Sequence, residues 1–444
     1  MRLTVPEPRI DLYKDGFAKH DQLGRKQTGD KLSNLVETID DPLVIALDGA
    51  WGSGKSFFLK CWVGEHLKRH GYTTQTVYFD AFQHDYLTDP LVALTQTICD
   101  QLPPGSKTSR FIRKGKKMLS KVAMPSVRVA AAIATSGASE MVGTVADAAI
   151  LSSWKEAERA AEQYWKREAG KCAAMGQFRA ALQELTDPNE NGEPQRKLVV
   201  VIDELDRCRP DYALSILEII KHFFNVDGVH FVLGANLKEL QNSVRARYGS
   251  AINAAKYLQK FVSLAVRLQG PKVGLGDQAA YSKHFDNIGD LIGLPNDWPR
   301  TFVRDYLIMS NHHLMISLRD VEKLACLLQV VPTGGIETSG ERHVFAGLII
   351  MEVTAPNLIE KARRGDLDYS DVEPLFLLET REEADGPFFD ARAAWRATKP
   401  NPPSSLQIKI SGRADRLFAQ SNRSRIIPNM IAERMDAFVL PDAG

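Results

Sequence analysis

The chain has 444 residues, of which 44% are hydrophobic and 25% charged, and its formal net charge at pH 7 is +1. This length leaves room for two or three domains with a large core. The near-neutral net charge argues against a general polyanion-binding role but does not exclude local patches of charge. The five cysteines lack a Cys-x-x-Cys pair, which gives no support for a structural zinc or disulfide framework. No secretory signal is visible, so we expect a cytoplasmic protein.

The first strong motif lies in PLVIALDGAWGSGKSFFLK, residues 42–60. The apolar run at 43–47 predicts a buried strand, and the apolar residues after Lys55 recur at helical spacing. Between them stands G-x-x-x-x-G-K-S, a loop whose backbone N–H groups wrap phosphates at the positive end of the following helix. The minor alternative is a strand-to-helix turn that contains glycines and an accidental lysine.

The residues of this loop have distinct expected roles. Lys55 is expected to reach the β- and γ-phosphates of a nucleotide, and the Ser56 hydroxyl to ligate Mg²⁺. Trp51 is expected either to pack beneath the loop, which is the favoured interpretation, or to lie over the nucleotide. The predicted nucleotide-binding residues of this stretch are Gly49, Ala50, Trp51, Gly52, Ser53, Gly54, Lys55, Ser56 and Phe57.

A second motif, RKLVVVIDELDRCRP, supplies the acidic partner that such a loop needs. The run at 198–202 contains four β-branched residues and predicts a fully buried parallel strand. It ends at Asp203, the expected Mg²⁺ partner through water. Glu204 is placed to orient or deprotonate the attacking water. Without the first motif, a solvated acidic turn would explain this pair equally well.

Two further strands fit the same sheet. The segment 76–85 places Asp80 after an apolar stretch, and the segment 229–240 places Asn236 at a strand tip, where it can contact the γ-phosphate or the lytic water. For each residue, a strand-end cap is an equal alternative. Helices are predicted between strands at about 90–101 and 212–224. The alternation predicts an α/β fold with a parallel sheet.

Together these stretches resemble the KAP group of P-loop NTPases. The resemblance covers about residues 20–330 and is carried by DQLGRKQTGDKL, GAWGSGKSFF, FDAF, IDELDRCRP and YLQKFV. The tryptophan of the phosphate loop belongs to the family pattern. Glu204 stands where the family commonly has Asp, and FDAF where FNAW is usual, and neither change removes a necessary charge. The resemblance implies an ASCE-type P-loop NTPase sheet with a helical insertion and a C-terminal helical lid domain.

The long segment between the two motifs predicts an insertion. Many members of the family insert two membrane-spanning helices here. Residues 107–121 hold seven basic residues and no acid, and the apolar segment that follows is interrupted by Arg128, Glu140 and Asp147. We therefore expect a soluble or at most surface-associated helical insertion without an integral span. The basic run is a solvated helix face, the favoured interpretation, or a patch for the phosphates of lipid or nucleic acid.

Helical periodicity dominates after residue 271. Residues 315–331 predict an amphipathic helix with Arg319 near its start. In related ATPases a lid arginine at such a position contacts the γ-phosphate, so the resemblance implies this role for Arg319, with a surface or salt-bridge role as the alternative. The resemblance also implies that Arg25 lies near the adenine of the bound nucleotide. From residue 371 the sequence predicts a linker or irregular tail in which IIPNMIAERMDAF forms a short docking helix.

The expected organisation has five parts. They are an N-terminal flank with the first half of the NTPase core (1–100), the insertion (101–195), the second half of the core (196–270), a helical lid (271–370) and a tail (371–444). Arg207 and Arg209 follow the acidic strand end, and we expect them to point away from their own phosphate loop or toward an adjoining subunit.

The sequence thus predicts a Mg²⁺-dependent ATP hydrolase that acts as a conformational switch or motor subunit. The predicted catalytic residues are Glu204, Lys55, Asn236 and Arg319. A nucleotide-gated scaffold with negligible turnover is the alternative, and a kinase role lacks a recognisable acceptor site. ATP is favoured because no guanine-reading N-K-x-D segment is present. Kinship with bacterial members implies a role in anti-phage defence and a homo-oligomer or an effector protein as partner, whereas nucleic-acid binding has no positive support.

Overall fold

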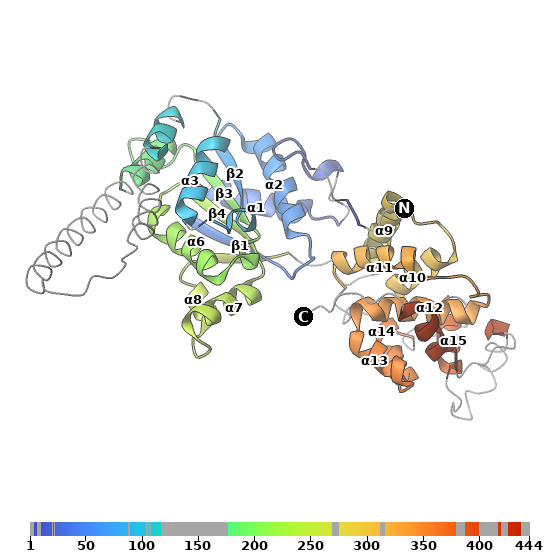
Figure 1. Ribbon diagram of the computed structural model, residues 1–444. Coiled ribbons are helices and arrows are strands. Elements are labelled where there is room, and N and C mark those ends of the chain that lie inside the picture. The colour runs from blue at the N-terminus through green and yellow to red at the C-terminus, as the bar shows by residue number, and fades with distance from the viewer. Residues whose placement is uncertain are drawn as a thin grey trace, which may run out of the picture.

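The computed structural model describes residues 10–116, 176–268, 275–310, 316–378 and 387–398, apart from 20, 22, 88, 104, 106 and 107, together with 4–6, 416–418 and 425–436. A five-stranded sheet forms the centre of the N-terminal part, and helices form the C-terminal part (Figure 1). Most of the predicted insertion, including its Ala-rich segment, lies outside the described residues. Among the helices that are described, none is long and apolar enough to cross a membrane.

The sheet is parallel throughout, as the alternating pattern predicts. Its strand order is β2-β3-β4-β1-β5. The strand that ends at Ala235 therefore lies between the strand before the phosphate loop and the strand that ends at Asp203, which confirms the ASCE-type arrangement. The strand bounds are β1 Leu43–Asp48, β2 Thr74–Asp80, β3 Lys197–Asp203, β4 Val229–Ala235 and β5 Leu264–Arg267.

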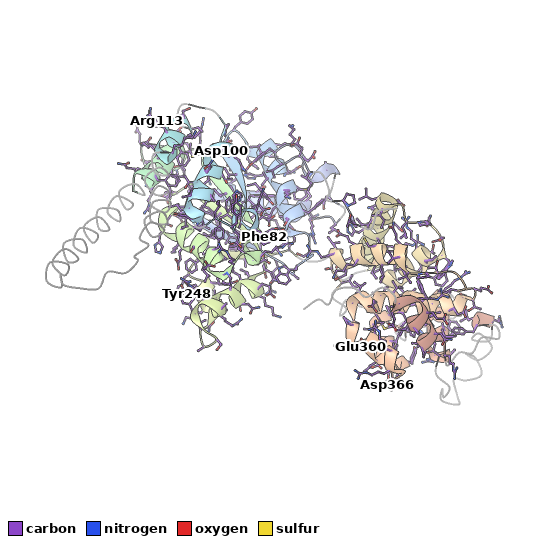
Figure 2. All side chains as sticks on the ribbon, in the orientation of Figure 1. Phe82, Asp100, Arg113, Tyr248, Glu360 and Asp366 are labelled. Atoms are coloured by element: carbon purple, nitrogen blue, oxygen red, sulfur yellow. The ribbon has the colours of Figure 1, made fainter. Side chains whose placement is uncertain are left out.

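Helices cover both faces of the sheet. On one face, α1 (Lys26–Thr38) and α2 (Lys55–His70) pack on alternate residues of the strands, including Val199 and Val201. The other face is covered by α3 (Pro90–Gln101), α6 (Pro210–Phe223) and α7 (Leu237–Tyr248). Side chains fill the space between these layers (Figure 2). Because both faces are covered, β3 and β4 are buried at every position, which explains their continuous apolar sequences.

Several helix starts follow directly from the sequence. Pro90 begins α3, where its missing N–H costs nothing, and the side chain of Asp89 accepts from the Leu91 N–H. Pro210 begins α6 in the same way. The shorter helices of the N-terminal part are η1 Phe17–Lys19, η2 Phe82–His84, η3 Leu205–Arg207 and α8 Ala254–Leu258.

The C-terminal helices share a separate apolar core. Trp395 and Tyr306 are fully buried in it, and the Trp395 indole donates to the Tyr306 hydroxyl. Its helices are α9 Leu275–Ile292, α10 Trp298–Met309, α11 Leu318–Val330, α12 Ser339–Thr354, α13 Pro356–Arg364, α14 Tyr369–Phe376, α15 Pro387–Ala397, α17 Ile426–Met430 and the π-helix η6 Ile431–Met435.

This core extends past residue 371 and so differs from the expected irregular tail. Phe376, Trp395 and Phe418 are buried in it although Pro, Gly and charged residues separate them in the sequence. Helical hydrophobic periodicity did not reveal this core, because its apolar residues lie on short helices that are joined by polar segments. The predicted short docking helix corresponds to α17, whose Met430 is also buried.

The N-terminal segment packs directly against α2. Phe17 lies 5.4 Å from Phe58 between ring centroids, and the backbone passes so close to Gly64 that a Cβ there would lie 1.9 Å from the Asp15 carbonyl oxygen. Only glycine permits this approach. The segment thus packs on the side of α2 that carries Phe58 and Gly64.

Replacing Gly64 by alanine should therefore destabilise the fold. We expect Gly64→Ala to lower the free energy of unfolding by about 1–3 kcal/mol, the usual cost of overpacking. Circular dichroism should show this as a lower midpoint of denaturant unfolding. The matched control is Gly176→Ala, because Gly176 lies in a helix and a Cβ there would meet no atom within 4 Å. Equal midpoints for the two variants would show that the segment does not pack as described.

Candidate functional site

The loop between β1 and α2 has the backbone geometry of a phosphate cradle. Gly52 and Gly54 adopt φ values of +76° and +79°, which side chains rarely tolerate. A Cβ at Gly49 would lie 2.7 Å from Ser53 Oγ. The glycines of the motif are therefore required by the turn itself. The loop opens directly onto the N-terminus of α2, where unpaired N–H groups and the helix dipole favour an anion.

Lys55 and Ser53 supply the polar groups of this loop. The Lys55 side chain is buried, and its Nζ donates to the Gly49 carbonyl at 2.7 Å and to the Ala50 carbonyl at 3.2 Å. Burial lowers the pKa of Lys55, and the nearby Asp206 and Asp203 carboxylates oppose this shift. Among the described residues, Ser53 Oγ is buried without a hydrogen-bond partner. A phosphate oxygen would satisfy both groups.

Asp203 ends β3 at the bottom of the same site and is fully buried. Its Oδ1 accepts from the Glu204 N–H at 2.9 Å, and its Oδ2 accepts from the Tyr78 hydroxyl at 2.6 Å. Burial raises the pKa of Asp203, while hydrogen bonds from Tyr78, Ser56 and the Glu204 N–H oppose this shift.

The pair Ser56 and Asp203 fits a magnesium ion bound with a nucleotide. Mg²⁺ is usually held by one or two carboxylates together with phosphates, rather than by a cage of protein ligands. A hydroxyl at the start of α2 that hydrogen-bonds a carboxylate at the end of β3 is such a donor set.

Glu204 is held in an unusual backbone conformation beside this pair. Its φ of +58° lies in the left-handed region, which a non-glycine residue adopts at a cost of about 1–3 kcal/mol. The conformation turns the side chain toward the cavity that Lys55 also lines. There Glu204 Oε1 lies 2.8 Å from Arg207 Nη1. Burial raises the pKa of Glu204, and Arg207 opposes the shift.

The structure corrects the expected direction of Arg207, whereas Arg209 lies outside the cavity of the phosphate loop. Arg207 lines the same cavity as Lys55 and is close enough to lower the pKa of that ammonium, so it does not point away from its own loop. Arg209 instead binds Asp85, with its Nε 3.0 Å from the carboxylate. Arg207 ends η3, whereas Arg209 lies beyond this turn and immediately precedes α6, so the two side chains leave the backbone in different surroundings.

Trp51 does not pack beneath the phosphate loop, so the favoured interpretation of this residue is wrong. Its side chain is 48% exposed, and its indole Nε1 donates to Asp206 Oδ2 at 2.7 Å. Asp206 itself is buried. The tryptophan thus connects the phosphate loop to the turn that carries Glu204 and Arg207. Sequence patterns gave no sign of this contact, since the two residues lie far apart in the chain.

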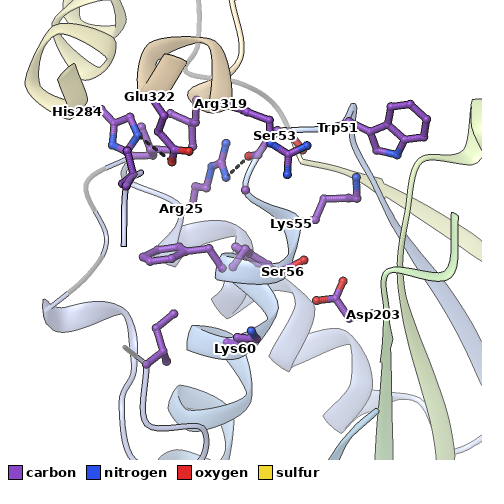
Figure 3. Close-up of a pocket in the computed structure, with 18 of the residues that line it drawn as sticks. Arg25, Trp51, Ser53, Lys55, Ser56, Lys60, Asp203, His284, Arg319 and Glu322 are labelled. Carbon is purple, nitrogen blue, oxygen red and sulfur yellow. Dashed lines mark hydrogen bonds and ion pairs between the residues drawn. The ribbon is translucent and has the colours of Figure 1, made fainter. Parts of the chain in front are cut away.

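Arg25 and the helical lid close the other side of the site (Figure 3). Arg25 is buried, and its Nη1 donates to the Ser53 carbonyl at 2.7 Å. The Leu318 N–H donates to the Gly52 carbonyl at 3.2 Å, which joins the start of α11 to the loop. Arg319 is exposed beside this contact and lines the cavity. Both predicted arginines therefore lie at the cavity, while their expected contacts with the adenine and the γ-phosphate stay predictions.

The cavity continues from the loop to the lid and measures about 570 Å³. Apolar side chains from both parts line its far end, including Phe17, Leu23 and Ile288. Asn236 is not among the lining residues. It caps α7 instead, with its Oδ1 accepting from the Lys238 N–H at 3.1 Å. The structure therefore brings together all of the predicted catalytic residues except Asn236, which lies at the neighbouring strand tip.

A parallel sheet with this phosphate loop and this acidic strand end defines a P-loop NTPase. The profile of the KAP family P-loop domain matches residues 25–332. Because this match covers more than half of the chain, the chain belongs to the KAP family of P-loop NTPases. A comparison with curated proteins gave no match.

Among solved structures, similarity to ORC proteins is weak. The Aeropyrum pernix ORC2 protein in ADPNP–ADP complexes is 12% identical, with 98% of each chain covered and a TM-score of 0.36. Drosophila ORC bound to DNA is 13% identical, with 88% of this chain and 85% of that chain covered and a TM-score of 0.37. Structural similarity this weak does not indicate the function of the present chain.

Loss of the Arg25 contact should weaken nucleotide binding. A charged hydrogen bond to a buried carbonyl contributes about 1.5–3 kcal/mol, so Arg25→Ala should raise the Kd of a non-hydrolysable ATP analogue about ten- to hundredfold in calorimetry. Lys26→Ala is the control, because Lys26 is exposed and its nearest carboxylate, Glu65, lies 3.9 Å away. Unchanged affinity in Arg25→Ala would show that the loop keeps its shape without the guanidinium.

Proposed function

We propose that the chain is a Mg²⁺-dependent ATP hydrolase that works as a conformational switch or motor subunit. The observation that carries this proposal is the meeting of Lys55, Ser56 and Asp203 at one cavity, with Glu204 on its wall. These residues come from two separate segments of the chain, the start of α2 and the end of β3. Together they provide a phosphate cradle, a metal site and a carboxylate beside both, which is the set that phosphoryl transfer to water requires.

Each residue has one task in the proposed reaction. Lys55 compensates charge on the β- and γ-phosphates, and Ser56 and Asp203 would hold Mg²⁺. When bound, the ion would neutralise charge that develops on the phosphate oxygens. Glu204 orients the attacking water and accepts its proton. Arg319 is the lid residue proposed to contact the γ-phosphate.

The contact between the lid and the loop supports the switch part of this proposal. The Leu318 N–H binds the Gly52 carbonyl, and a Cβ on Gly52 would lie 2.9 Å from that of Arg319. A shift of the loop on nucleotide binding or phosphate release would therefore move the start of α11. Since α11 belongs to the C-terminal helical core, the shift would reach that whole part.

A nucleotide-gated scaffold with negligible turnover is the second candidate, and one observation favours it. The ion pair of Glu204 with Arg207, at 2.8 Å, engages the carboxylate that hydrolysis needs. If this pair persists with nucleotide bound, the Arg207 charge makes Glu204 a weaker base. The two candidates therefore make opposite predictions for Arg207.

Family membership supports the remaining parts of the proposal. We infer a cytoplasmic role in bacterial anti-phage defence, with a homo-oligomer or an effector protein as partner, because family members are known from phage-exclusion systems. The described part of the basic run, residues 108–116, is helical, and its Lys114 pairs with Glu184 at 2.7 Å. This pairing supports a solvated helix face over a phosphate-binding patch.

Two variants separate nucleotide binding from hydrolysis. Lys55→Ala should abolish binding of a non-hydrolysable ATP analogue in calorimetry, because the phosphate charge is left uncompensated. Glu204→Gln should bind the analogue like the parent chain but lose about 10²–10⁴-fold in the rate of phosphate release, since the general base is removed. Hydrolysis at the parental rate in Glu204→Gln would contradict the assignment, and equal binding in Lys55→Ala would make the loop structural.

The role of Arg207 is open to a direct test. Because Arg207 lines the cavity of its own chain, Arg207→Ala should lower the rate of ATP hydrolysis at least about tenfold. Mixing it with Lys55→Ala should restore no activity. The control is Arg209→Ala, since Arg209 is bound to Asp85 and should tolerate removal with little loss of rate. A higher rate in Arg207→Ala would favour the scaffold, and recovery on mixing would show delivery to a neighbouring subunit.

A further inference from the structure

Tyr78 lies on the same face of the sheet as Asp203 although it belongs to the neighbouring strand. In the parallel register of β2 and β3, Tyr78 is opposite Val201 and Asp80 is opposite Asp203. Side chains of a strand alternate between faces, so Tyr78, Val201 and Asp203 all point toward α2. The Tyr78 ring belongs to the apolar cluster beneath that helix. Its hydroxyl can therefore reach along the strand to the Asp203 carboxylate.

The hydroxyl completes a set of donors that fixes this carboxylate. Tyr78 Oη donates to Asp203 Oδ2 at 2.6 Å, and the Glu204 N–H donates to Oδ1 at 2.9 Å. Both side chains are buried, with Tyr78 7% exposed and Asp203 fully enclosed. Because these two donors bind different oxygens, rotation of the carboxylate about its Cβ–Cγ bond would break both of these hydrogen bonds.

Tyr78 is itself held in place by α3. Gln101 accepts from the Tyr78 N–H at 2.8 Å and donates to the Tyr78 carbonyl at 2.9 Å. Its side-chain amide therefore binds the backbone of the edge strand β2 at both of these groups. On the other side, the Lys60 ammonium lies 5.8 Å from the centre of the Tyr78 ring. Figure 3 shows Lys60 on α2 below Ser56, and both residues line the cavity. The hydroxyl thus has little freedom to turn away.

We propose that Tyr78 is a positioning residue for the nucleotide-bound Mg²⁺, acting through the Asp203 carboxylate. The inference rests on the proposed binding of Mg²⁺ and ATP at this site. A carboxylate meets a metal or its water ligands along fixed lone-pair directions, so its orientation sets the affinity for the ion. By holding Oδ2, Tyr78 keeps the carboxylate plane aligned with Ser56. Groups that orient metal partners in this way typically change metal affinity 10–100-fold when they are removed.

Packing alone does not require this hydroxyl. A phenylalanine would fill the same space beneath α2, and a buried hydroxyl is unfavourable unless it is hydrogen-bonded. The chain offers a matched comparison in Tyr212 on α6. That residue is also buried, but its hydroxyl has no hydrogen-bond partner among the described residues. Tyr212→Phe therefore removes the same atom from the other face of the sheet without touching the proposed metal site.

The experiment measures binding of a non-hydrolysable ATP analogue by calorimetry over a series of Mg²⁺ concentrations. Mg²⁺ should increase the affinity for the analogue, and we measure the Mg²⁺ concentration that gives half of this increase. In Tyr78→Phe we expect this concentration to rise about tenfold or more, while the affinity without Mg²⁺ stays unchanged. Tyr212→Phe should behave as the parent chain. A Tyr78→Phe chain whose Mg²⁺ dependence stays within twofold of the parent would overturn the proposal. A parent chain that binds the analogue equally with and without Mg²⁺ would instead refute the proposed function.

A second measurement avoids any change in stability that Tyr78→Phe brings. With 3-fluorotyrosine at position 78, the hydroxyl and the packing are retained, and the fluorine resonance reports on the hydrogen bond to Asp203. We expect the resonance to shift when Mg²⁺ is added to the chain with the bound analogue, and the shift should saturate with the same Mg²⁺ dependence as binding. A resonance that is insensitive to Mg²⁺ would contradict the role of Tyr78.

Discussion

The buried carboxylate of Asp203 is the constraint on which the rest of the site depends. A charge that is removed from water is costly unless hydrogen bonds or ions compensate it. Here a serine at the start of α2, a tyrosine from the adjacent strand and a backbone N–H supply the compensation. These groups meet only if β2 and β3 are in register and α2 begins at the phosphate loop. The residue that would hold the metal therefore also fixes how three parts of the core fit together.

The same loop connects the core to the helical part. Its backbone carbonyls are bound by Arg25 and by the first residue of α11, and its tryptophan is bound to Asp206. Each contact joins the loop to a different segment: the N-terminal flank, the lid and the turn after the acidic strand. A loop held by three segments would transmit a change in its own conformation to all of them, and this is the physical basis of the proposed switch.

Much of the core could be predicted from the sequence. The continuous apolar runs of β3 and β4 indicate strands buried on both faces, and Pro90 and Pro210 mark helix starts, because these signals depend on local geometry alone. Prediction was weaker where local signals conflict with distant packing. Trp51 looked like a core residue and is half exposed, and the segment after residue 371 looked irregular yet contributes Trp395 to a core.

By itself, the sequence determined the family, the phosphate loop and the acidic strand end, because a glycine-rich turn and a buried strand leave marks over a few adjacent residues. Tertiary structure alone decided which side chains meet across the sheet. Tyr78 is 125 residues from Asp203, and Trp51 is 155 residues from Asp206. Such contacts follow from strand order, register and the direction of η3. No periodicity within one segment encodes these features, since they arise only when separate segments share one core.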